Sequence, residues 1–173
     1  DLLESLLTSN PNEAKSLRAV QADVTKEDDV KNLFSSAVSI FGRVDLLFNN
    51  AGASLPATEI DQVTLEDWNR IIDVNLTGMF LCAREAFRTM KNQNPVGGRI
   101  INNGSIAAYA PRPRSAAYTA SKHAVSGLTK SIQLDGRSYK IACSQIDIGN
   151  ADTEIGNSVS KGALQADGTV KTE

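Results

Sequence analysis

Tyr118 and Lys122 stand four residues apart in the segment Tyr118-Thr-Ala-Ser-Lys122, and Ser105 precedes them along the chain. Residues four apart share one face of a helix, so we expect the Lys122 ammonium beside the Tyr118 hydroxyl. A positive charge at close range lowers the pKa of a phenol below its ordinary value of about 10, toward the range that a general acid or base needs. The three residues therefore predict redox chemistry at a carbonyl or an alcohol.

The pair alone also fits a simpler interpretation, because Tyr-x-x-x-Lys arises by chance. An amphipathic helix with an exposed Lys122 and with Tyr118 at the edge of the core would give the same spacing. The elements around the pair must decide between the two interpretations.

Composition favours a soluble globular protein. The chain has 173 residues, 41% of them hydrophobic, and a net charge of −2, which predicts one domain over residues 1–173 and gives no electrostatic reason to expect nucleic acid or an anionic membrane. No apolar run approaches the roughly 20 residues of a membrane span. Cys82 and Cys143 lack metal-ligand spacing and His123 is the single histidine, so we expect reduced thiols in a cytoplasmic protein and no metal site.

Short apolar runs alternate along the chain with longer segments of helical periodicity. We expect helices at 26–41, 64–90 and 115–139, the end of another helix at 1–8, and strands at 17–22, 44–48, 99–103 and 140–148. Gly42 should end the first of these helices, and Thr64 should cap the next, with Asp67 completing a capping box. This alternation predicts an α/β fold: a doubly wound parallel sheet covered by helices in an α/β/α arrangement.

Polar residues and glycines directly follow the predicted strands. Ligands of such sheets bind at the carboxyl ends of the strands. At these ends stand Asp23, Asn49-Asn-Ala-Gly52, Gly104-Ser105 and Ile148-Gly149. The sequence thus predicts that its polar and glycine positions meet along one edge of the sheet.

Taken in order, these residues resemble the short-chain dehydrogenase/reductase family from about residue 17 to residue 155. The matching motifs are Asp23-Val24, Asn49-Asn-Ala-Gly52, Val74-Asn-Leu-Thr-Gly78, and then Ser105, Tyr118 and Lys122 at the family's spacing. The resemblance implies a Rossmann-like NAD(P)-binding domain that transfers a hydride between NAD or NADP and an alcohol or ketone substrate. It also implies a homodimer or homotetramer built on the long helices.

By the same resemblance, four positions carry the catalytic roles. Tyr118 acts as the general acid or base, and Lys122 lowers its pKa and binds the nicotinamide ribose. Ser105 polarises the substrate oxygen where negative charge develops, and Asn75 holds a water that relays protons.

Further positions are implied as cofactor contacts. The predicted cofactor-binding residues are Asp23, Val24, Asn49, Ala51, Gly52, Tyr118, Lys122, Gly149 and Thr153. Asp23 and Val24 would contact the adenine ring. In the last loop Gly149 and Thr153 stand in register with the family, but Ile148 replaces its usual proline, so the expected contacts there have less support.

Each motif also has a bland alternative. Asn75 would face solvent from a helix, Asn49 would serve a turn, Ser105 would begin one, and Asp23 would cap the following helix. For Arg112 and Arg114, solvated loop charges are favoured over recognition of an anionic substrate. Two functional alternatives also stay open: a dehydratase or epimerase with the same Tyr-Lys pair, and a non-catalytic binding protein of the same fold.

One family motif is absent from the sequence. Family members open with a strand and a glycine-rich Thr-Gly-x-x-x-Gly-x-Gly turn that holds the pyrophosphate. In the strand order 3-2-1-4-5-6, the segments 17–22 and 44–48 would be strands 3 and 4, separated by the missing strands 1 and 2. We therefore expect native residues before Asp1 and a further helix and strand after Glu173, with weak cofactor binding by residues 1–173 alone. NAD and NADP stay equal alternatives, because the discriminating side chains belong to that opening segment.

Overall fold

The computed structural model describes residues 16–149, 163–164 and 169–171. Its principal helices are α2 (Glu27–Phe41), α3 (Leu65–Ile72), α4 (Met79–Asn92) and α5 (Ala116–Gly136). Its strands are β1 (Leu46–Asn49), β2 (Gly98–Asn103), β3 (Ile141–Ile146), β4 (Ala163–Leu164) and β5 (Val170–Lys171). Single turns of tighter or wider helix are η2 (Ile60–Gln62), η3 (Asp73–Gly78, a π-helical turn), η4 (Ile106–Ala108) and η5 (Arg137–Tyr139).

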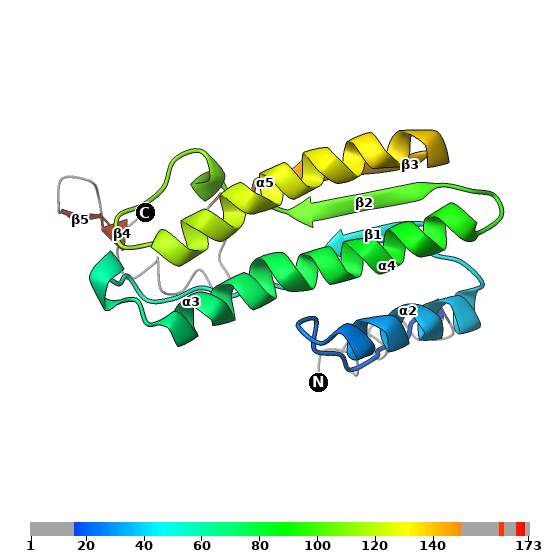
Figure 1. Cartoon of the computed structure of the whole chain (residues 1–173), viewed down its shortest axis with the longest axis horizontal. Coiled ribbons are helices and arrows are strands. Elements are labelled where there is room, and N and C mark those ends of the chain that lie inside the picture. Colours follow the sequence, from blue (N-terminus) through cyan, green and yellow to red (C-terminus); the bar gives the residue numbers. More distant parts are fainter. Residues whose placement is uncertain (1–15, 150–162, 165–168, 172–173) are drawn as a thin grey trace.

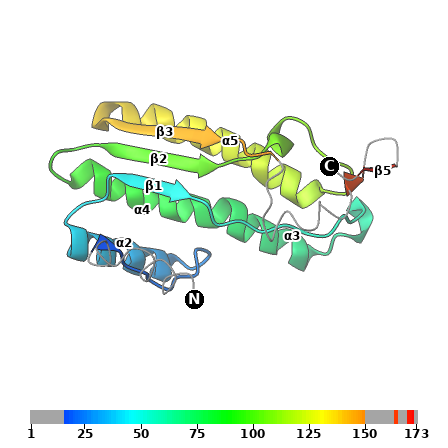
Figure 2. The same cartoon turned by 180° about the vertical axis from the view of Figure 1, so that it is seen from behind.

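The sheet is parallel, with β2 between β1 and β3. Helices α4 and α5 lie on the same face of this sheet, and α2 lies beside α4 (Figures 1 and 2). Alternate strand residues show the consequence: Leu47 packs on the core, while Leu46 and Phe48 point away from it and are exposed. The predicted α/β fold with a Rossmann-like parallel sheet is confirmed, and the described residues supply the helical layer of one face.

The core lies between the sheet and this helical layer. It joins α2, α4 and the buried side of β2 and β3, through Val30, Phe34, Leu81, Cys82, Ala83, Ala86, Met90, Ile100, Ile141 and Cys143. Cys82 and Cys143 are free thiols whose burial raises their pKa values to about 11. Both cysteines therefore pack as small apolar residues at neutral pH.

Two helix boundaries follow the expected local chemistry. Gly42 adopts a left-handed φ of 79° after α2, and its N–H donates to the Val38 carbonyl at 2.8 Å. The Thr64 hydroxyl oxygen accepts from the Asp67 N–H at 3.0 Å and begins α3. The helix predicted at 64–90 is confirmed in extent, but the π-helical turn η3 interrupts it between α3 and α4.

The prediction of a strand at 17–22 is wrong. These residues have no hydrogen-bonded partner strand among the described residues, and most of them are exposed. An apolar pattern indicates only which side a strand would bury, whereas a strand also needs a neighbouring backbone to pair with. The helix predicted at 1–8 lies outside the described residues.

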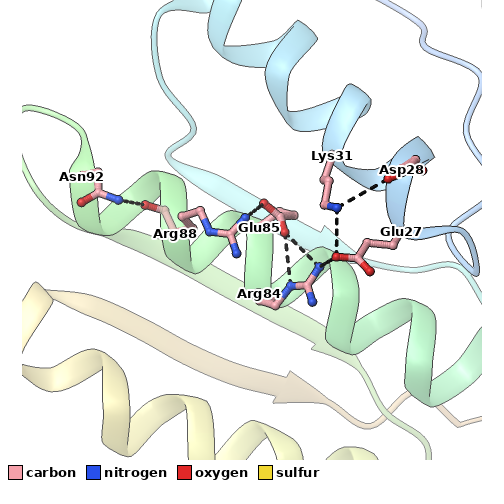
Figure 3. A network of polar contacts seen from close by, with 7 residues as sticks. All are labelled: Glu27, Asp28, Lys31, Arg84, Glu85, Arg88 and Asn92. Carbon is pink, nitrogen blue, oxygen red and sulfur yellow. Dashed lines mark hydrogen bonds and ion pairs between the residues drawn. The ribbon is translucent and has the colours of Figure 1, made fainter.

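A chain of charged side chains joins α2 to α4 (Figure 3). Arg84 pairs with Glu27 at 2.8 Å and with Glu85 at 3.1 Å, and Glu85 also pairs with Arg88 at 2.7 Å. The Glu85 side chain is only 7% exposed, whereas that of Glu27 is 49% exposed. The network therefore runs from the buried flank of α4 to the surface of α2.

Candidate active site

The carboxyl ends of β1, β2 and β3 all point toward the side of the molecule where α5 begins (Figure 2). Asn49, Ser105 and Asp147 stand at or just beyond these ends. A parallel sheet gathers its strand ends in this way, so residues distant in sequence meet along one edge. Of the predicted strand-end residues, Asn49 and Ser105 do stand at or just beyond the ends of paired strands, whereas Asp23 follows no strand among the described residues.

Tyr118 and Lys122 lie on the first turns of α5 and share a face. The Lys122 Nζ is 5.5 Å from the centre of the Tyr118 ring. Lys122 is only 4% exposed, and its Nζ donates a hydrogen bond to the Asn103 carbonyl at 2.8 Å. The alternative of an exposed lysine on a surface helix is therefore wrong.

Two opposing effects set the charge of Lys122. Burial disfavours the ammonium and lowers the Lys122 pKa from 10.5 to about 8, while the Asp147 carboxylate partly opposes this shift. A lysine with a pKa near 8 is still predominantly charged at neutral pH. It supplies a buried positive charge next to a phenol.

Asn75 lies inside the π-helical turn η3 and is fully buried. Its Oδ1 accepts from the Ala53 N–H at 2.7 Å, and its Nδ2 donates to the Ala53 carbonyl at 3.0 Å and to the Ser121 hydroxyl at 3.1 Å. The solvent-facing alternative for Asn75 is wrong. The side chain instead joins the loop after β1 to α5, one residue before Lys122.

Ser105 is 7% exposed and caps the turn η4. Its Oγ accepts from the Ala107 N–H at 3.1 Å, so Ser105 does begin a turn. A hydroxyl that accepts through its oxygen still has its own O–H to donate. The turn-forming alternative and the predicted catalytic role are therefore compatible.

A row of amide side chains crosses the sheet beneath these residues. Asn49, Asn102 and Gln145 are register partners on the three strands. The Asn49 Nδ2 donates to Asn102 Oδ1 at 2.9 Å, and the Asn102 Nδ2 donates to the Thr129 hydroxyl at 2.9 Å. Gln145 Nε2 donates to the Ser126 hydroxyl at 3.0 Å. The row therefore ties the strand ends to α5. The Asn49 amide, predicted to line the cofactor's path, also serves this structural purpose.

The remaining predicted cofactor residues surround η3 and the strand ends. Asp23 Oδ1 accepts from the Thr25 N–H at 3.0 Å and its hydroxyl at 2.7 Å, while Lys26 takes the N-cap position of α2, so the capping alternative for Asp23 is wrong. Val24 packs against Gly78, where an added Cβ would lie 2.8 Å from Val24 Cγ2.

Four other predicted cofactor positions remain: Gly52, Ala51, Gly149 and Thr153. Gly52 approaches the Asn75 amide, since a Cβ there would lie 3.6 Å from Asn75 Oδ1. Ala51 and Gly149 are exposed, and Thr153 lies outside the described residues. Cofactor contacts at all these positions stay predictions.

Arg112 and Arg114 line a hollow of about 550 Å³ between η2 and the start of α5. The Arg114 guanidinium pairs with Glu59 at 2.5 Å, and its side chain is 47% exposed. A neighbouring carboxylate balances this charge, which favours the solvated-loop interpretation of Arg114.

Asp147 is the site residue that sequence reasoning missed. Its carboxylate accepts hydrogen bonds from the Ser105 N–H at 3.1 Å, the Gln145 amide at 2.5 Å and the Tyr109 hydroxyl at 3.1 Å. A sequence signal existed: a charged residue stands between Ile146 and Ile148 at a strand end where special residues gather.

Within the described part of the chain, no group of three or more histidine, cysteine, aspartate or glutamate residues could hold a metal ion. The described helices include none long and apolar enough to span a membrane.

Comparison with known proteins connects this geometry to a family. The family model described as short chain dehydrogenase matches residues 1–163. The chain is 38% identical over 136 residues to a 3beta-hydroxysteroid dehydrogenase of Mediterraneibacter gnavus, a match covering 79% of this chain and 48% of that protein. It is 37% identical over 137 residues to a 3-oxoacyl-[acyl-carrier-protein] reductase of Synechocystis sp., covering 79% of this chain and 54% of that protein. The chain thus spans about half the length of the curated relatives it matches.

Solved structures show the same likeness. A 3-ketoacyl-(acyl-carrier-protein) reductase from Brucella melitensis complexed with NADH superimposes with a TM-score of 0.79 at 32% identity, covering 83% of this chain and 60% of that one. ElxO with NADP bound superimposes with a TM-score of 0.82 at 29% identity, covering 91% of this chain and 63% of that one.

Proposed function

The chain belongs to the short-chain dehydrogenase/reductase family, and from this premise we propose that the whole protein transfers a hydride between NAD or NADP and an alcohol or carbonyl substrate. The observation that carries the proposal is the buried Lys122 ammonium beside Tyr118, with Ser105 at the neighbouring strand end. Burying a charge is costly unless it is paired and hydrogen-bonded, and buried titratable groups with shifted pKa values cluster at functional sites.

The residues present fit a nicotinamide cofactor at this edge. The Lys122 ammonium has three N–H donors and uses one on the Asn103 carbonyl, which leaves others for ribose hydroxyls. The nearby Gly52 carries no side chain to obstruct an approaching ligand. When bound, a nicotinamide cofactor supplies or accepts the hydride.

The chain's own residues handle the proton. In the direction of reduction, the Tyr118 O–H donates its proton to the carbonyl oxygen as negative charge develops there. The Lys122 ammonium stabilises the resulting phenolate, and the Ser105 O–H donates a hydrogen bond to the same substrate oxygen. In the direction of oxidation, the Tyr118 phenolate accepts the proton of the alcohol.

Replacing Tyr118 tests the proposal. In the whole protein, Tyr118→Phe should lower kcat by about 10²–10⁴-fold, because the transferred proton loses its donor, while the cofactor Kd stays nearly unchanged. Turnover would be followed by nicotinamide absorbance with a hydroxysteroid, a 3-oxoacyl thioester and glucose, compounds suggested by the relatives' names. Tyr139→Phe is a matched control, because Tyr139 packs on Phe87 and Lys91 at the opposite end of α5.

Two outcomes would contradict the assignment. Wild-type turnover in Tyr118→Phe would remove Tyr118 from the mechanism. Product formation with no net change in nicotinamide absorbance would favour the dehydratase or epimerase alternative.

The proposal extends to assembly and location. The whole protein is a homodimer or homotetramer of the cytoplasm, with an interface on the long helices. Exposed apolar side chains on α3, α4 and α5 support that surface, among them Trp68, Phe80 and Leu134.

A further inference from the structure

The Asp147 carboxylate bonds to both ends of the segment that carries Ser105. One oxygen, Oδ1, accepts the Ser105 N–H at 3.1 Å, immediately before the turn η4. The other, Oδ2, accepts the Tyr109 hydroxyl at 3.1 Å, immediately after the turn. A single side chain from beyond the end of β3 thus holds the turn at its beginning and its end.

The surroundings hold the carboxylate in this position. The Gln145 amide donates to Asp147 Oδ1 and also to the Ser126 hydroxyl on α5. Gln145 therefore links the Asp147 carboxylate to α5. Gly104 leaves the required space, because an added Cβ there would lie 2.1 Å from Asp147 Oδ1. The Asp147 carboxylate therefore fills the space that a side chain at position 104 would take.

Ser105 needs this external support because its own side chain already participates in the turn. Its Oγ accepts the Ala107 N–H, so the direction of the hydroxyl follows the orientation of the turn as a whole. A catalytic donor displaced by about 1 Å loses much of its effect. The group that fixes the turn therefore fixes the donor.

We propose that Asp147 is a positioning residue of this active site, which holds the Ser105 main chain so that the Ser105 hydroxyl meets the reacting oxygen. The proposal rests on the proposed oxidoreductase function for its kinetic consequence. The hydrogen bond to Ser105 can be tested without turnover.

A different role for the same carboxylate would act through charge. Asp147 favours the charged form of Lys122 and so opposes the effect of burial on the Lys122 pKa. Asparagine separates the two roles, because its Oδ1 still accepts the Ser105 N–H while the negative charge is gone. Measurement at about pH 6.5, below the Lys122 pKa of about 8, keeps the ammonium protonated and limits the effect of charge.

The kinetic experiment uses the whole protein with three substitutions. At about pH 6.5, Asp147→Ala should lower kcat by about 10–100-fold with the cofactor Kd unchanged, because the Ser105 turn loses its anchor. Asp147→Asn should restore kcat to within about threefold of wild type, since the acceptor returns. Asp135→Ala, which removes an exposed carboxylate on α5, is the control and should match wild type.

An independent readout uses hydrogen exchange of the Ser105 amide measured by NMR without substrate. The exchange rate should rise in Asp147→Ala and return toward the wild-type value in Asp147→Asn, because only the former removes the acceptor. Unaltered Ser105 exchange in Asp147→Ala would overturn the proposal whatever the kinetics show.

The kinetic outcomes are equally decisive. Wild-type kcat in Asp147→Ala, or an equal loss of kcat in the alanine and asparagine variants, would overturn the positioning role. If Asp147→Ala does not fold, the asparagine variant alone decides. Faster exchange of the Ser105 amide, or a loss of kcat, in the folded Asp147→Asn protein would then overturn the positioning role. Failure of the oxidoreductase proposal shows separately, as full turnover in Tyr118→Phe with the Ser105 exchange pattern intact.

Discussion

The charge on Lys122 is the most consequential property of a single residue in this site. Burial lowers the Lys122 pKa from 10.5 to about 8, and Asp147 partly counters that shift. NMR titration of the lysine side chain in the whole protein should therefore show loss of the Lys122 proton near pH 8. In Asp147→Asn the loss should occur at lower pH, because the favourable negative charge is gone. A Lys122 that titrates near its ordinary value, or whose pKa rises in Asp147→Asn, would contradict the assignment.

The same shift links Lys122 to stability. The pKa of Lys122 is lower in the folded than in the unfolded protein, so between pH 8 and 10.5 the unfolded state binds more protons. The Lys122 contribution to the free energy of unfolding therefore rises with pH in this window. Below pH 8 the burial of the charged Lys122 opposes folding, a cost in stability that the proposed catalytic role would explain.

For single residues, the sequence predicted those relations that follow from the periodicity of a helix. The shared face of Tyr118 and Lys122 follows from four-residue helical spacing, and the structure confirms it. Asn75 is buried within a π-helical turn, which no sequence pattern predicted. The position of Asp147 could not be predicted from side-chain types, because its partner is the backbone N–H of Ser105, a group that every residue type except proline offers.

Among the elements, the contact between α2 and α4 combines an apolar core with exposed ion pairs, and the two contribute unequally. Phe34 is 7% exposed and packs in the core, whereas the Arg84 and Glu27 side chains are 31% and 49% exposed. In the whole protein, Phe34→Ala should lower the free energy of unfolding by about 3 kcal/mol through the cavity it leaves. Arg84→Ala should lower it less, because solvent screens the partly exposed pair with Glu27 and the buried Glu85 keeps its pair with Arg88.

Urea denaturation of both variants would compare the two contributions. Raising the salt concentration should leave the difference between Phe34→Ala and wild type unchanged, because burial of apolar surface is not an ionic interaction. A loss in Arg84→Ala equal to that in Phe34→Ala would show that the charged network, rather than the core, holds α2 in place.

Element boundaries were predictable where a local signal sets them. Gly42 and Thr64 end and begin helices through backbone geometry and side-chain capping that the sequence states directly. Residues 17–22 carry the apolar pattern of a strand, but pairing depends on a neighbour that the pattern does not specify. Helix ends set by a glycine or a capping side chain could thus be predicted from the sequence, whereas the pairing of residues 17–22 with another strand could not.

At the scale of the whole molecule, the described residues pack helices on one face of the sheet and leave the other face open. Leu46, Phe48 and Ile146 on the open face are 56%, 46% and 47% exposed. These side chains come from β1 and β3, on either side of β2. Parallel sheets of this class are normally covered on both faces, so the open face is an apolar surface in need of a cover.

Residues 1–173 should therefore bind an apolar fluorescent dye such as ANS. Phe48→Lys should reduce dye binding, because it places a charge on the open face. Ile60→Lys is the matched control: Ile60 is 78% exposed but lies in η2, away from the sheet, so dye binding should persist.

Equal reductions of dye binding in both variants would show that the dye binds to scattered surface residues. No dye binding by residues 1–173 would mean that the open face is covered in solution, by self-association or by rearrangement, and size-exclusion chromatography would distinguish the two.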